Sequence, residues 1–179
     1  MSTVASVSLT SAVIEIEKHV AAGGWNQKTR MFALVPTADL LTTQPTMAAA
    51  LGISDEGAAN GGIPTFTSIE QDGLKLKLPL DEMLAGMEWP PAVAGVALVL
   101  ESQMLPPSAE AALPAGEDLE KWVARHPERQ EVRMAVGVLR DGTRQAAVRL
   151  RSKDRDSEVL SGADLVPNLA EALLGMFET

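Results

Sequence analysis

Five arginines lie within "EVRMAVGVLRDGTRQAAVRLR", residues 131–151, in a chain whose formal net charge is −9. The guanidinium group presents a planar fork of N–H donors that suits carboxylates and phosphates. Between residues 125 and 155 the chain has nine Lys or Arg against four Asp or Glu, whereas the rest has six against twenty. This basic segment on an acidic body is therefore a candidate contact for an anionic ligand or an acidic partner.

The same stretch alternates as two β-strands joined by a turn. A two-residue turn at residues 141–142 would mix arginines with valines on one face, which a half-buried sheet does not tolerate. A three-residue turn over residues 140–142, with Gly142 in the left-handed conformation, gathers the apolar residues on one face. We therefore predict this register, which places Arg133 directly opposite Arg149, where the two charges repel by up to about 1 kcal/mol.

Two interpretations of the arginine pair stay open. In the first, the face is solvated or covered by a helix, and Glu131, Asp154 or a helix carboxylate neutralises the pair. In the second, the pair binds an anionic group of a ligand or of an acidic partner segment. His126 ends a predicted helix, where a cation suits the helix dipole, and it is the one imidazole suited to acid–base work. The candidate contact residues are Arg133, Arg149, Arg129, Arg30 and His126.

Motifs for catalysis, metals or cofactors are missing, so we predict no catalytic residue, metal or cofactor. The chain has no cysteine. "GAANGG" lacks the Lys-Ser/Thr ending of a phosphate-binding loop, and "VLSGADL" is not the G-x-S-x-G motif of a nucleophilic serine. Trp25, Trp89 and Trp122 lie at the ends of predicted elements. They are expected to anchor the core, and an exposed tryptophan would instead indicate an interface.

The composition indicates one cytoplasmic domain. The 179 residues are 46% hydrophobic, enough for a single buried core over residues 1–179. With no Tyr, three Phe, three Trp and net negative charge, we predict no nucleic-acid binding. The first twenty residues have neither the basic start of a signal peptide nor an uninterrupted apolar span, so we predict no membrane insertion. The absence of cysteine fits a reducing compartment.

The hydrophobic pattern predicts an α+β domain with a mainly antiparallel sheet of about four to six strands flanked by helices. A helix is expected over residues 11–22 and buried strands over 31–36 and 92–102. Residues 65–71 and 74–80 are expected to pair as a hairpin around Asp72-Gly73. The arginine-rich hairpin is followed by a C-terminal helix, and residues 52–62 and 104–118 are expected to be surface loops.

Four motifs support a family resemblance: "WNQKTRMFALVPTADL", "WPPAVAGVALVLE", "HPERQEVRMAVGVLRDG" and "DLVPNLAEAL". The chain resembles an uncharacterised family of small cytoplasmic proteins from actinobacteria over most of its length, and residues 52–72 fit least well. The resemblance implies an actinobacterial cytoplasmic protein. It implies no activity and no catalytic residues.

Two functional hypotheses follow. The first is a non-catalytic protein-interaction or regulatory domain that uses the basic hairpin face, either to form a homodimer or another homo-oligomer, or to bind an acidic protein partner. The alternative is an enzyme or sensor that binds a small anionic metabolite, such as a nucleotide or a phosphorylated compound, at the same face.

Overall fold

The arginine-rich hairpin lies within a six-stranded sheet. The computed structural model describes residues 3–177 except 54–58, 61–62, 105–111, 113, 115, 117 and 128. The surface loops predicted over residues 52–62 and 104–118 therefore fall mostly outside the described residues. Neighbouring strands of the sheet are antiparallel throughout. In spatial order the strands are β4 (Phe66–Glu70), β1 (Arg30–Pro36), β5 (Gly95–Met104), β6 (Gln130–Leu139), β7 (Arg144–Leu150) and β8 (Leu160–Gly162).

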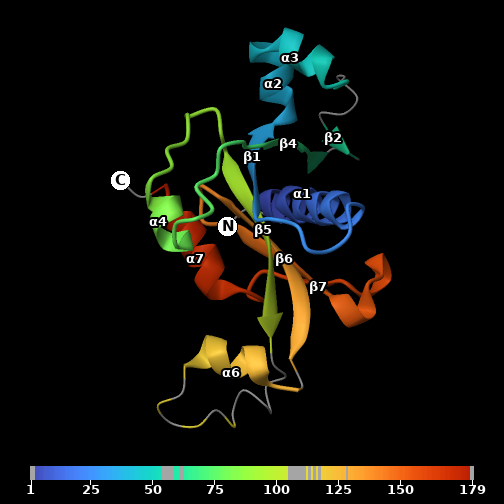
Figure 1. Ribbon diagram of the computed structural model, residues 1–179. Helices are drawn as coiled ribbons and strands as arrows, with labels where there is room; N and C mark the ends of the chain where they lie inside the picture. The colour runs from blue at the N-terminus through green and yellow to red at the C-terminus, as the bar shows by residue number, and fades with distance from the viewer. Residues whose placement is uncertain are drawn as a thin grey trace.

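The helices pack on both faces of this sheet, which confirms a single α+β domain (Figure 1). The hairpin β6–β7 is followed by two short 3₁₀ turns and the added strand β8 before the C-terminal helix begins. A separate two-stranded sheet joins β2 (Ala59–Asn60) to β3 (Ile63–Pro64). The helices are α1 (Thr3–Ala21), α2 (Thr37–Thr43), α3 (Pro45–Ala50), α4 (Leu80–Ala85), α6 (Leu119–Arg125) and α7 (Pro167–Gly175), and the 3₁₀ turns are η2 (Arg151–Lys153) and η3 (Asp156–Glu158).

The predicted register of the hairpin is confirmed. Arg133 pairs with Arg149, and Val136 pairs with Ala146. The connection is the three-residue turn 140–142, across which the N–H of Leu139 donates to the carbonyl of Thr143. Gly142 has a φ of +95°, the left-handed conformation that the turn requires. The alternation of apolar and polar residues, together with the three-residue turn, therefore predicted correctly which side chains share a face.

The hairpin predicted around Asp72-Gly73 is wrong. Residues 66–70 do form a strand, but it pairs with β1 along the edge of the sheet. Residues 71–79 contain no strand. Pro79 lacks a donor for a ladder, and pairing with β1 instead brings Ile69 beside the buried Ala33. The contact between distant segments is thus more favourable than the local hairpin.

Each face of the sheet has its own hydrophobic cluster. The amphipathic helix α1 covers one face and lies against β6 and β7. Its buried side chains, which include Leu9, Val13 and Ile16, pack on this side. The opposite face is covered by α4 and α7 through Leu84 and Leu173. α2 and α3 extend beyond the end of β1 (Figure 1). In the described part of the chain no helix is long and apolar enough to span a bilayer.

Candidate docking site

Arg149 is buried beneath α1 and is neutralised by carboxylates of this chain. Its side chain projects from β7 and the residue is 2% exposed. The carboxylate of Glu17, on α1, accepts hydrogen bonds from Nε at 3.0 Å and 3.1 Å and from Nη2 at 2.6 Å. Asp154 accepts from Nη1 at 3.1 Å, and Asp156 accepts from Nη2 at 2.5 Å. Hydrogen bonding to Glu17 is the largest cause that raises the pKa of Arg149, and bonding to Arg149 lowers the pKa of Asp156.

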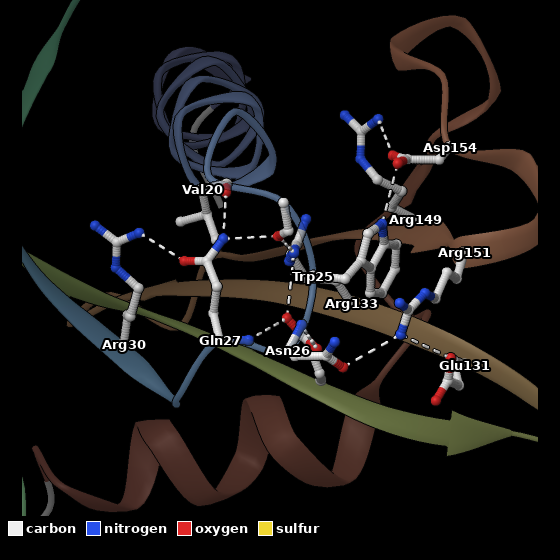
Figure 2. Close-up of polar contacts among 12 residues, drawn as sticks. Val20, Trp25, Asn26, Gln27, Arg30, Glu131, Arg133, Arg149, Arg151 and Asp154 are labelled. Atoms are coloured by element: carbon white, nitrogen blue, oxygen red, sulfur yellow. Dashed lines mark hydrogen bonds and ion pairs between the residues drawn. The ribbon is translucent and has the colours of Figure 1, made fainter.

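Arg133 is buried beneath the segment that connects α1 to β1. Arg133 is 1% exposed, and its guanidinium carbon lies 4.4 Å from the centre of the Trp25 ring (Figure 2). Nη2 donates to the carbonyl of Gly24 and, at 3.2 Å, to Glu101. The Trp25 indole N–H donates to Asp154 at 3.0 Å, and the ring also faces Arg151. Trp25 thus covers Arg133 and also bonds to Asp154, which accepts a hydrogen bond from Arg149.

Glu101 fixes the segment that covers Arg133. Its carboxylate accepts the backbone N–H groups of Asn26 at 2.8 Å and Gln27 at 3.0 Å. Asn26 has a φ of +66°, which is uncommon for a residue other than glycine. Burial raises the pKa of Glu101, but the hydrogen bonds from Gln27, Asn26 and Arg133 outweigh it, so the pKa lies below the usual range. The ionised form of Glu101 is therefore the form that holds this segment.

Acid is expected to release the segment. Because the pKa of Glu101 is lowered in the folded state, its stabilising effect is fully present above the ordinary pKa of about 4.3 and is lost as the pH falls through the lower value. In an NMR pH titration, the amide signals of Asn26 and Gln27 should shift below about pH 4. The Glu101→Gln variant should lack this step. A transition of these two amides above pH 5 would show that Glu101 does not control them.

The five predicted contact residues do not form one exposed site. Arg133 and Arg149 are buried and paired within the chain, as in the first of the two interpretations. Arg30 donates two hydrogen bonds to Glu70, at 2.7 Å and 2.8 Å. Arg129 donates to the carbonyl of His126, whose ring lies 4.8 Å from that of Trp122 in an edge-on arrangement. The expectation that the arginine pair faces a ligand or partner therefore needs correction. Arg149 is paired with Glu17 of α1, and Arg133 is paired with Glu101 of β5.

An apolar hollow lies on the opposite face of the sheet, between α2 and the segment around Trp89. We call it the α2 hollow; it has a volume of about 610 Å³. Met47 contributes to its wall and is 43% exposed, although methionine is usually buried. The side chains and segments that line it are Ala33, Val35, Asp39, Leu40, Thr43, Gln44, Met47, Ile69, Gln71 and residues 87–93.

The α2 hollow has acidic residues in its lining. Asp39 and Glu88 are its charged lining residues, and the described residues that line it include no Lys, Arg or His. Both carboxylates are exposed at the rim. The net charge of the chain has the same sign. A binding partner with positive charge beside apolar side chains is therefore complementary to this hollow.

Arg140 holds the wall of the α2 hollow in place. Its Nε donates to the carbonyl of Val93 at 2.7 Å, and its Nη2 donates to those of Pro90 at 3.0 Å and Trp89 at 3.2 Å. Its guanidinium lies 4.6 Å from the centre of the Phe177 ring. The sequence pattern places Arg140 in the turn after β6 and does not indicate this role. One feature of the sequence did point to the α2 hollow, the Trp-Pro-Pro at residues 89–91, because an incompletely covered tryptophan indicates an interface.

Comparison with known proteins identifies the family and gives no activity. No curated protein and no solved structure matches the chain. The family of PPA1309-like proteins matches residues 9–178, which include both hydrophobic clusters and the α2 hollow. The chain therefore belongs to the family of PPA1309-like proteins.

Proposed function

We propose that the protein is a non-catalytic interaction domain that binds a segment of a partner protein in the α2 hollow. The observation that carries the proposal is an apolar hollow of about 610 Å³ with Trp89 and the exposed Met47 in its walls. Tryptophan and methionine are enriched in protein interfaces, and anchor residues bind in such pockets. The hydrogen bonds from Arg140 keep one wall preformed, which lowers the entropic cost of binding.

The partner segment is basic and apolar. Asp39 and Glu88 favour Lys or Arg on the partner, and the net charge of −9 attracts a basic segment from a distance. This replaces the acidic partner expected from the sequence, because that expectation depended on an open arginine pair. The small anionic metabolite loses the same support, since both arginines are buried within the chain and each is paired with a glutamate. We further infer that the protein acts in the cytoplasm of an actinobacterium, as its sequence motifs and the absence of cysteine suggest.

Selection from a display library of random peptides on the immobilised full chain tests this function. We expect enriched peptides that combine apolar residues with Lys or Arg. The variant Asp39→Lys/Glu88→Lys should bind them at least about tenfold more weakly, because like charges then meet across the rim. The matched control is Glu15→Lys/Glu158→Lys, which changes the net charge equally at exposed residues that do not line the hollow. Affinities are measured by calorimetry.

Three results would contradict the proposal. The library could yield no enriched peptide, or enriched peptides could bind the two charge variants equally. A dimer in light scattering that is lost only in Asp39→Lys/Glu88→Lys would identify a second copy of the chain as the occupant. Equal melting temperatures of both variants and the parent would show that any loss of binding is local.

A further inference from the structure

The strand β4 forms one edge of the main sheet and adjoins the α2 hollow. It pairs with β1 on one side, and in the described ranges no strand pairs with its other side. The opposite edge of the sheet is β8, which has only three residues. β4 has five residues, FTSIE, and no Lys or Pro, the residues by which proteins commonly protect exposed edges. Its one charged residue, Glu70, is paired with Arg30. β4 is therefore the longer of the two edges and the less protected.

The direction of each backbone group of β4 follows from its ladder with β1. The N–H of Gln71 donates to the carbonyl of Met31 at 2.8 Å, and the N–H of Thr37 donates to the carbonyl of Thr65 at 3.0 Å. In an antiparallel pair, alternate residues direct both backbone groups toward the partner strand. Residues 65, 67, 69 and 71 therefore face β1. The backbone groups of Phe66, Ser68 and Glu70 face outward.

The same strand contributes side chains to the α2 hollow. Ile69 and Gln71 are among its lining residues, together with Ala33 and Val35 of β1. A strand added to the outer edge of β4 would lie about 4.8 Å from it and would direct every second side chain to the face of Ile69. Outward hydrogen-bonding groups and the border of the apolar hollow thus occur on one five-residue strand. This is the combination used in β-strand addition, where backbone bonds give affinity and pockets give specificity.

We propose that the partner segment binds as an extended strand that pairs with the outer edge of β4. This inference rests on the function proposed above and specifies how the segment binds. Alternate residues of the segment are apolar and pack over Ile69 into the α2 hollow, while a Lys or Arg among them meets the acidic rim formed by Asp39 and Glu88. The backbone N–H and carbonyl of Ser68 form the central pair of hydrogen bonds to the segment.

The substitution Ser68→Pro tests this binding mode. Proline removes the outward N–H of residue 68 and leaves the bonds of Thr67 and Ile69 to β1 intact. We expect Ser68→Pro to bind a library-selected peptide at least about tenfold more weakly. The control Ser68→Ala keeps the N–H and should bind like the parent chain. In hydrogen exchange, the peptide should protect the amides of Phe66, Ser68 and Glu70 in the parent chain.

A second measurement does not depend on the folding of the proline variant. Methylation of the peptide's own backbone nitrogens, one at a time, should weaken binding only at alternate positions, because alternate N–H groups face β4. Unchanged binding by Ser68→Pro, or a methylation pattern without alternation, would overturn the inference. If Asp39→Lys/Glu88→Lys still loses the peptide in that case, the function of the hollow stands and only the strand mode fails.

Discussion

Replacing Glu17 with Gln is expected to lower the free energy of unfolding by about 3 kcal/mol. Glu17 is 1% exposed and its carboxylate binds the buried guanidinium of Arg149 through three short contacts. A neutral amide leaves a buried cation without its nearest counter-charge. The effect lies at the lower end of the range for a broken buried pair, because Asp154 and Asp156 remain bound to Arg149. Urea denaturation followed by circular dichroism measures the change.

The matched control for this prediction is Glu15→Gln. Glu15 lies on the same helix and is exposed, so its substitution should change stability by less than about 0.5 kcal/mol. The double variant Glu17→Leu/Arg149→Leu removes both charges and should recover most of the loss, because replacing a whole buried pair with apolar residues is often neutral. A Glu17→Gln variant as stable as the parent chain would show that α1 does not neutralise Arg149.

Replacing Gly95 with Ala is expected to cost about 3 kcal/mol, and the same substitution at Gly137 about 1 kcal/mol. A Cβ at Gly95 would lie 2.2 Å from the backbone carbonyl oxygen of Val138, which cannot move without shifting β6. A Cβ at Gly137 would lie 2.6 Å from Cγ2 of Val13 and 3.0 Å from Cδ1 of Leu9, side-chain atoms that can rotate away. Thermal unfolding of the two variants measures the difference.

The Gly95 substitution should also weaken peptide binding. β5 begins at Gly95, two positions after Val93, the last residue of the segment 87–93 that lines the α2 hollow. If the first residue of β5 shifts, residues 87–93 move relative to the residues of β1 that also line the hollow. Gly137 lies under α1 on the other face, so its alanine variant should retain peptide affinity. Equal losses of stability, or a larger loss at Gly137, would contradict this description of the packing.

The sequence predicted the fold class and the register of the arginine pair because both depend on local patterns. Alternation with a period of two and the left-handed Gly142 determine which residues share a face. The partner of Arg149 could not be predicted in this way. Glu17 lies 132 residues away and reaches Arg149 only because α1 crosses β7. The acidic residue and the basic residue lie far apart in the sequence, and folding brings them into contact.

The α2 hollow was also beyond the reach of sequence patterns. Its lining comes from β1, α2, α3, β4 and the segment that carries Trp89, and the pairing of β4 with β1 brings two of these elements together. Apolar alternation predicts that Val35 or Ile69 faces a core. It does not predict which core-facing residues remain uncovered by α4 and α7. The exposed Met47 follows from the position of α2 and α3 beyond the end of β1 (Figure 1).

The most direct test of the docking site is an NMR titration of the isotopically labelled full chain with a library-selected peptide. We predict that the largest shifts occur at the amides of Met47, Ile69 and Val93 and at the indole N–H of Trp89, residues that line the α2 hollow. Saturable shifts at these groups, absent in Asp39→Lys/Glu88→Lys, are the expected result. Shifts confined to α1 or α6, with the four groups unchanged, would contradict the proposed function.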